Sequence, residues 1–190
     1  MIRAVFLDRD GTMNQDTKGY ISKPQDFNLF PFTPKAIKLL NTAGFLLFCV
    51  SNQSGIARGY FSVNSLKLIH KKLESKLLYE GAKLDKILYC PYFEGGLVDK
   101  YNKKSSLRKP DIGMFRLAQR EYNFSTKDSF IIGDKPSDIE FGKRAGLKTI
   151  LVLTGRGKQA FYERSVKPDF VCENLLVAAK LIKDFKRFVY

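Results

Sequence analysis

Short apolar runs alternate with longer amphipathic stretches along the 190-residue chain. Apolar runs bounded by turn residues are typical of buried parallel strands, whereas apolar positions at helical spacing are typical of helices. The runs predict strands at 4–7, 45–50, 86–89, 130–132, 148–153 and 169–171. Amphipathic spacing predicts helices at 33–44, 62–79 and 136–146, and from Asp111 and Asn174 onward. This order predicts an α/β protein with a doubly wound, Rossmann-like parallel sheet and flanking helices.

Capping residues mark the ends of several predicted helices. Thr33 is expected to be an N-cap, with Pro34 at the first helical position and Gly44 at the end of the same helix. Ser62 is expected to cap the next helix. His70, the only histidine, borders the apolar face of that helix. We interpret it as an ordinary helix residue rather than a catalytic or metal-binding one.

Two stretches carry no strong strand or helix pattern. The first, 15–32, is long for a connection, and long loops beside active sites often bind substrate. The second, 90–107, follows a predicted strand and is expected to lie over the site as a lid. No linker or internal repeat divides the chain, so 1–190 is predicted to be one domain with 90–107 as an insertion loop.

Two carboxylates, Asp8 and Asp10, directly follow the first predicted strand. Ligands bind beyond the carboxyl ends of the strands in open α/β sheets, so these acids stand where chemistry is expected. One carboxylate can act as a nucleophile and the other as a proton donor, and together they can hold a divalent cation. Taken alone, the pair is equally compatible with a simple strand end.

Further polar clusters are expected at the same edge of the sheet. They are Ser51-Asn52-Gln53-Ser54-Gly55, Arg108-Lys109-Pro110 and Gly133-Asp134-Lys135. Each of them, taken singly, also fits a polar turn or surface charge. Asp138, in the first turn of a predicted helix, fits helix capping as well as catalysis.

Together these clusters supply the groups that phosphoryl transfer to a carboxylate needs. Asp8 is the predicted nucleophile, and Asp10 is the predicted acid and base. Ser51, Asn52 and Lys109 are expected to stabilise the oxygens of the transferred group. Oxygen ligands for Mg²⁺ are expected from Asp8, Asp134 and a backbone carbonyl near Asp10.

The composition restricts the class of protein. Thirty-three basic residues against nineteen acidic ones give a net charge of +14, which attracts phosphorylated metabolites or nucleic acid. No DNA- or RNA-binding signature accompanies the charge, so nucleic acid is not the expected partner. The three cysteines are far apart, and no signal-peptide or membrane-spanning pattern occurs. A cytoplasmic monomer without disulfides is therefore expected.

The motifs Asp8-Arg9-Asp10-Gly11-Thr12, 51–55, 108–110 and 133–135, in this order, resemble the four motifs of the haloacid dehalogenase superfamily. Within it, the chain resembles the D,D-heptose 1,7-bisphosphate phosphatases across nearly its whole length, including 52–59 and Gly19-Tyr20. The resemblance implies a Mg²⁺-dependent sugar phosphatase of heptose precursor synthesis, with a minimal loop cap and no large cap domain.

The resemblance also implies a role for each matching residue. The implied catalytic residues are Asp8, Asp10, Ser51 and Lys109, and the implied metal positions are Asp8, Asp10 and Asp134. The implied substrate-binding residues are Asp16, Gly19, Tyr20, Asn52, Gln53, Ser54, Arg58, Arg108 and Lys135. Lys18 is a further cation expected near the mouth of the site.

The chain departs from the family at the insertion. Many members fold this segment around zinc, using Cys-Pro-His and a later Cys-x-Cys. The matching positions here read Cys90-Pro91-Tyr92 and Ser105-Ser106-Leu107. One thiolate is too few for a structural zinc site, so zinc binding is expected to be lost. The insertion is then either ordered by packing of Tyr92, Phe93 and Tyr101, or mobile.

Three alternative functions remain open from the sequence. Histidinol-phosphate phosphatase is the closest, because that related enzyme uses the same chemistry. A polynucleotide 3′-phosphatase is supported only by the positive charge. A catalytically inactive phosphate-binding or regulatory protein belongs to a different class, and the complete set of acids together with Lys109 disfavours it.

Overall fold

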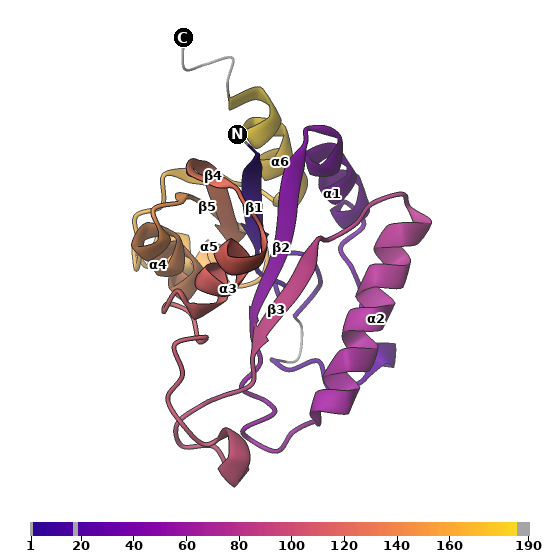
Figure 1. Cartoon of the computed structure of the whole chain (residues 1–190), viewed down its shortest axis with the longest axis vertical. Coiled ribbons are helices and arrows are strands. Elements are labelled where there is room, and N and C mark those ends of the chain that lie inside the picture. The colour runs from indigo at the N-terminus through magenta and orange to yellow at the C-terminus, as the bar shows by residue number, and fades with distance from the viewer. Residues whose placement is uncertain (1, 17–18, 186–190) are drawn as a thin grey trace.

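The computed structural model describes residues 2–16 and 19–185. Their strands form one six-stranded sheet with every neighbouring pair parallel, in the order β3-β2-β1-β4-β5-β6. The strands are β1 (Arg3–Leu7), β2 (Phe45–Asn52), β3 (Lys86–Cys90), β4 (Ser125–Gly133), β5 (Lys148–Val152) and β6 (Phe170–Cys172). The chain builds outward from β1 to β3 and then crosses back to β4 (Figure 1). The predicted doubly wound α/β fold is confirmed.

Helices cover both faces of the sheet because the strands are apolar on both sides. Val5 and Leu7 face one core, which is shared with α1 (Thr33–Thr42), α2 (Val63–Tyr79) and α6 (Leu175–Asp184). Ala4 and Phe6 face the other core, which is shared with α3 (Gly113–Glu121) and α4 (Pro136–Ala145). In Figure 1, α2 and α4 accordingly lie on opposite sides of the sheet. No described helix combines the length and hydrophobicity needed to cross a bilayer.

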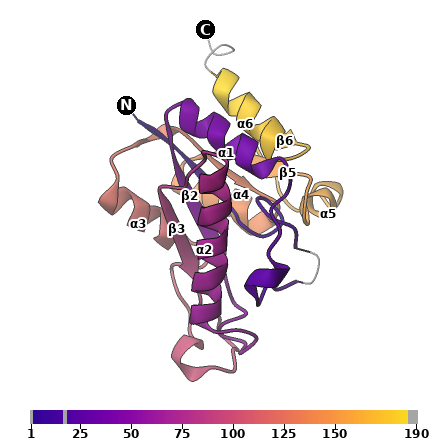
Figure 2. The ribbon, with the colours of Figure 1, turned by 90° about the vertical axis from the view of Figure 1, so that its right-hand side faces the viewer.

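The two long connections lie beyond the carboxyl ends of the strands. The first contains a short 3-10 helix, η1 (Pro24–Asp26), and the insertion contains another, η2 (Asp99–Tyr101). Figures 1 and 2 show the insertion at the end of the molecule opposite to α6. The fold therefore gathers both irregular segments at the edge where polar side chains are expected.

Packing and hydrogen bonds hold the described insertion in place. The rings of Tyr92 and Tyr101 lie 5.9 Å apart, and the N–H of Phe93 donates to the carbonyl of Tyr101 at 3.1 Å. The N–H of Val98 donates to the carbonyl of Ala57 at 2.9 Å. The thiol of Cys90 donates to the carbonyl of Tyr92 at 3.6 Å. Of the two alternatives for this segment, the structure favours the packed one.

Several boundaries differ from the sequence predictions. Thr33 is not an N-cap: Phe32 occupies the N-cap position of α1 without a side-chain cap, and the buried Thr33 hydroxyl donates to the Met13 carbonyl at 2.7 Å. The Met13 carbonyl also accepts the Phe30 N–H at 3.1 Å, so the Thr33 hydroxyl ties the start of α1 to the loop after β1 rather than capping the helix. The prediction also missed the helix α5 (Gly157–Tyr162), which lacks a side-chain cap. His70 is buried on α2 beside the ring of Tyr89.

Candidate active site

Three neighbouring strands deliver polar side chains to one cavity. Asp8 follows β1, Ser51 and Asn52 end β2, and Lys135 comes two residues after β4. The predicted metal ligand Asp134, next to Lys135, is buried and does not line the cavity. The chain changes direction between β1 and β4, which is where open α/β sheets bind ligands. The cavity has a volume of about 220 Å³ and is lined by most of the predicted site residues. They are Asp8, Asp10, Asp16, Gly19, Tyr20, Ser51, Asn52, Gln53, Ser54, Arg108, Lys109 and Lys135.

The ammonium group of Lys109 joins two carboxylates in the interior. Its Nζ lies 2.7 Å from Asp8 Oδ1, 2.6 Å from Asp138 Oδ1 and 2.6 Å from the Val50 carbonyl oxygen. Burial alone would lower the pKa of Lys109, but Asp138 and Asp8 outweigh it and raise the pKa. Lys109 is therefore a permanent cation fixed against Asp8.

Asn52 positions Lys109 through the backbone. Its Oδ1 accepts the Lys109 N–H at 2.9 Å, and its Nδ2 donates to the Lys109 carbonyl at 3.0 Å. The sequence suggested that this amide contacts a phosphoryl oxygen. The structure instead uses both ends of the amide to hold the loop that carries Lys109.

Asp8 is ionised and lies between two cations. Besides Lys109, Lys135 Nζ lies 3.3 Å from Asp8 Oδ2. Burial alone would raise the pKa of Asp8, but Lys109 and Lys135 outweigh it and hold the pKa well below its usual range. A carboxylate that keeps its charge at the floor of a cavity is suited to nucleophilic attack.

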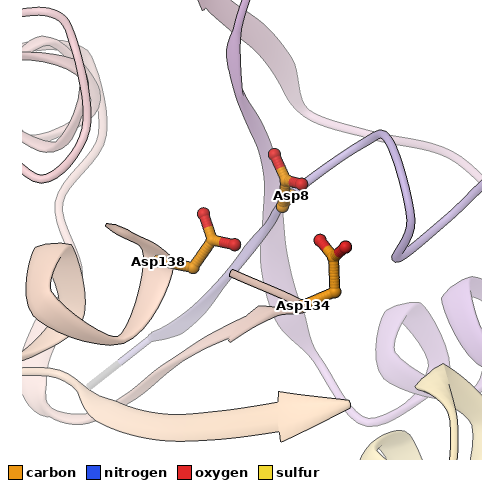
Figure 3. A group of neighbouring side chains, drawn as sticks. All are labelled: Asp8, Asp134 and Asp138. Carbon is orange, nitrogen blue, oxygen red and sulfur yellow. The ribbon is translucent and has the colours of Figure 1, made fainter. Parts of the chain in front are cut away.

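Asp8, Asp134 and Asp138 form a cluster of buried acids. Each offers an oxygen within 4.8 Å of the others. Figure 3 shows them coming from the end of β1, the end of β4 and the first turn of α4. Burial raises the pKa of Asp134, and although Lys135 opposes this, Asp8 and Asp138 add to it. The three carboxylates therefore carry more negative charge than the neighbouring cations and the buried surroundings stabilise.

The Lys135 ammonium occupies the position predicted for a metal ion. Its Nζ lies 2.7 Å from the Asp10 carbonyl oxygen, 3.3 Å from Asp8 Oδ2 and 3.4 Å from Asp134 Oδ1. These three oxygens are the ones expected to bind Mg²⁺, and hard divalent cations prefer such ligands. A Cβ on Gly11 would lie 2.2 Å from Asp134 Oδ2, so glycine is needed for this close approach. The residues present fit a divalent cation.

Asp10 lies in a separate hydrogen-bonded group. Its carboxylate pairs with the buried Arg9, whose Nε and Nη2 each lie 2.9 Å from an Asp10 oxygen. Gln53 Nε2 and Asn14 Nδ2 donate to the same carboxylate at 2.8 and 3.0 Å. Burial would raise the pKa of Asp10, but Arg9 outweighs it and lowers the pKa. Asp10 thus offers its backbone carbonyl, not its carboxylate, to the position held by Lys135.

The remaining predicted residues are divided between the cavity and its rim. Ser51 Oγ accepts from Gln53 Nε2 at 2.7 Å, and the Tyr20 and Ser54 hydroxyls lie 3.2 Å apart. Arg58 does not line the cavity; its guanidinium lies over the ring of Phe93. Lys18 falls outside the described residues.

The sequence interpretation missed two contributors to the site and left a third undecided. Arg9 and Asn14 hold Asp10, and no periodicity distinguishes them from surface polar residues. Asp138 is a helix cap, as one of its two interpretations had it, and it also pairs with Lys109, while its role in catalysis stays a prediction. Its Oδ2 accepts the Lys135 N–H at the start of α4, and its Oδ1 pairs with Lys109.

Comparisons with known proteins show the family to which the chain is similar. A family model described as "HAD-hyrolase-like" matches residues 106–178. A D-glycero-D-manno-heptose-1,7-bisphosphate 7-phosphatase of Thermosynechococcus vestitus is 38% identical, over 94% of each chain. A D-glycero-beta-D-manno-heptose-1,7-bisphosphate 7-phosphatase of Haemophilus ducreyi is 41% identical, over 92% of this chain and 94% of its own.

A solved structure is also similar to this chain. The D,D-heptose 1,7-bisphosphate phosphatase from B. bronchiseptica, complexed with magnesium and phosphate, superposes with a TM-score of 0.86. It is 31% identical and covers 95% of this chain and 98% of its own. The chain belongs to the heptose-1,7-bisphosphate 7-phosphatase family of HAD-like phosphoric monoester hydrolases.

Proposed function

We propose that the protein is a Mg²⁺-dependent D-glycero-D-manno-heptose 1,7-bisphosphate 7-phosphatase that acts through an aspartyl phosphate. The observation that carries the proposal is the ionised Asp8, buried between Lys109 and Lys135 at the cavity. The names of the relatives support the choice of substrate. A single domain over 1–190, a monomeric state and a cytoplasmic location remain predictions.

In the first half of the reaction, Asp8 Oδ attacks the phosphorus atom while the bond to the C7 oxygen breaks. Arg9 lowers the pKa of Asp10 in the protein without substrate, so the reaction requires that Asp10 takes up a proton when the negatively charged substrate binds. Asp10 gives this proton to the departing oxygen, and Arg9 stabilises the carboxylate that remains. In the second half, Asp10 takes a proton from water as the water oxygen attacks the aspartyl phosphate. Asp8 is restored and inorganic phosphate leaves. Lys109 stays beside Asp8 and stabilises the transferring oxygens.

Asp8, Asp134 and the Asp10 carbonyl would hold the divalent cation. When bound, it offsets the negative charge of the phosphoryl group as this group approaches Asp8. Lys135 occupies these oxygens in the structure, so it has to move when the cation binds. The Lys135 side chain lines the cavity, so its ammonium group can turn toward the substrate instead.

Removal of Lys135 should tighten metal binding. We expect Lys135→Met to bind Mg²⁺ about three- to tenfold more tightly than the wild type in calorimetric titration, because one competing cation is gone. Asp134→Asn should bind it more weakly. Activity should require Mg²⁺ and disappear with EDTA, and metal analysis should find no stoichiometric zinc. Weaker Mg²⁺ binding by Lys135→Met than by the wild type would show that Lys135 does not compete with the metal ion for these oxygens.

A substrate panel tests the proposed function. Heptose 1,7-bisphosphate, its 1-monophosphate, histidinol phosphate and a 3′-phosphorylated oligonucleotide would be compared by kcat/KM. Arg108 lines the cavity and fits a second phosphate, whereas the ammonium of histidinol phosphate would be repelled by it. We expect the bisphosphate to be preferred over histidinol phosphate by about ten- to a hundredfold. Equal or better kcat/KM with histidinol phosphate would reject the assignment.

A further inference from the structure

The loop after β5, residues 153–156, contacts both segments that carry the proposed metal ligands. β5 pairs with β4 and β6 in the sheet and is not a neighbour of β1. The Thr154 hydroxyl nevertheless donates to the Gly11 carbonyl, in the turn after β1, at 2.6 Å. The Arg156 N–H donates to Oδ2 of Asp134, which follows β4, at 2.9 Å. One loop therefore links the ends of two other strands.

The Thr154 contact restricts the carbonyl of Asp10. This carbonyl shares a peptide group with the Gly11 N–H, which donates to the Asn14 carbonyl at 2.8 Å. The next peptide group carries the Gly11 carbonyl, which accepts the Thr154 hydroxyl. Each peptide group is planar and moves as a unit, and the glycine between the two groups would otherwise allow wide rotation. Anchors on both sides of Gly11 therefore limit how far the Asp10 carbonyl can turn.

The Arg156 contact orients the carboxylate of Asp134. Oδ2 is held by the Arg156 N–H, whereas Oδ1 lies 3.4 Å from the Lys135 ammonium, at the proposed metal position. A Cβ on Gly155 would lie 2.2 Å from Asp134 Oδ2 and 2.6 Å from the Gly11 Cα. The loop therefore passes so close to both segments that no side chain fits there, and it sets their separation.

The short helix α5 anchors this loop to the body of the protein. The Gly157 N–H donates to the Thr154 carbonyl at 2.9 Å, which closes the turn that leads into α5. Ala160 of α5 lies in a buried cluster with Leu151 of β5 and Ile139 of α4. Packing on the sheet thus fixes the place from which Thr154 reaches the turn after β1.

We propose that Thr154 is a positioning residue that fixes the Asp10 carbonyl relative to Asp134 and thereby makes the site selective for Mg²⁺ over Ca²⁺. Mg²⁺ demands near-octahedral ligands at about 2.0–2.1 Å, whereas Ca²⁺ accepts about 2.3–2.6 Å and more variable geometry. Ligands that are free to spread should therefore lose Mg²⁺ affinity and keep Ca²⁺ affinity. Thr154 does not line the cavity, so it acts through Gly11 rather than on the substrate. The inference rests on the proposed function, which places a divalent cation at these oxygens.

The test is calorimetric titration of Mg²⁺ and of Ca²⁺ into the protein without substrate. We expect Thr154→Val to weaken Mg²⁺ binding roughly ten- to a hundredfold, the usual range for a residue that orients a metal ligand. Ca²⁺ binding should change by less than about threefold, because its geometry is more tolerant. Thr154→Ala also lacks the hydroxyl and adds no bulk, so it should show the same shift in selectivity. Thr154→Ser keeps the hydroxyl and should restore the preference for Mg²⁺.

Thr42→Val is the matched control. The exposed Thr42 hydroxyl also donates to a backbone carbonyl, that of Lys38, at 2.9 Å, and its loss should leave both affinities within about twofold. Equal weakening of Mg²⁺ and Ca²⁺ in the Val and Ala variants, or unchanged affinities, would overturn the inference alone, and so would a Ser variant that resembles them. A wild-type protein that binds no Mg²⁺ would overturn the proposed function and this inference with it.

Discussion

Asp8→Asn is expected to lower kcat at least about a thousandfold, which corresponds to about 4 kcal/mol in the activation barrier. The amide keeps the shape of the side chain but cannot attack phosphorus. The fold should survive, because Lys109 retains Asp138 and the Val50 carbonyl, and Lys135 retains the Asp10 carbonyl. Measurement of kcat and of the thermal midpoint on the same preparation separates chemistry from folding.

Asp111→Asn is the matched control for this substitution. Asp111 pairs with Arg144 at the surface, and its side chain is 57% exposed. The same change of acid to amide there should leave kcat within about twofold, since surface substitutions are usually small in effect. An Asp8→Asn enzyme that keeps more than about a tenth of wild-type activity, a loss below about 1.4 kcal/mol, would exclude Asp8 as the nucleophile.

Lys109→Met is expected to be the most destabilising substitution in the site. Asp8 and Asp138 would lose the cation between them, and breaking a buried ion pair in this way typically costs about 3–5 kcal/mol. Methionine has a similar volume, so the loss reports charge rather than a cavity. Denaturant unfolding measures the change, and activity should fall with it because Asp8 loses its neighbour.

Addition of Mg²⁺ should recover part of the stability lost in Lys109→Met, because it supplies positive charge to the same acids. Lys104→Met is the control: Lys104 pairs with Glu94 at the surface, and its side chain is 84% exposed. Its unfolding free energy should change by less than about 1 kcal/mol. Similar stability of the two variants would show that the buried Lys109 contacts do not hold the site together.

The sheet was predictable because each strand carries its own signal. The run before Asp8 is apolar on both faces and ends abruptly in acids, so both the strand and its carboxyl end can be recognised. The same reasoning placed Asp134 beside Asp8. By contrast, α5 has six residues and no side-chain cap, and only its packing against the α4 side of the sheet identifies it.

Roles within the site depend on contacts between distant residues, which spacing does not encode. Arg9 stands between two acids in the sequence and looks like a surface charge, yet it is fully buried against Asp10. Asn52 was expected to face substrate, but it holds the Lys109 backbone instead. Lys135 was expected to contact substrate and lies on the oxygens predicted for the metal. The Asn52 and Lys135 contacts arise only when the strands meet, and Arg9, although next to Asp10 in the sequence, is buried only in the folded protein.

The insertion shows a further limit of sequence reasoning. The expected loss of zinc binding left the order of the insertion undecided, because aromatic packing has no fixed spacing. In the structure, Tyr92 pairs with Tyr101, and Phe93 faces two arginines. The residues named for packing were therefore well chosen, but the arginine partners of Phe93 were not foreseen.

The most direct test of the account follows which phosphate leaves heptose 1,7-bisphosphate. Phosphorus NMR resolves the anomeric phosphate from the phosphate at C7, and both signals can be followed in one reaction with enzyme and Mg²⁺. A 7-phosphatase should convert the C7 signal into that of inorganic phosphate while the anomeric signal persists. Loss of the anomeric signal first, or persistence of both signals under conditions where histidinol phosphate is hydrolysed, would contradict it.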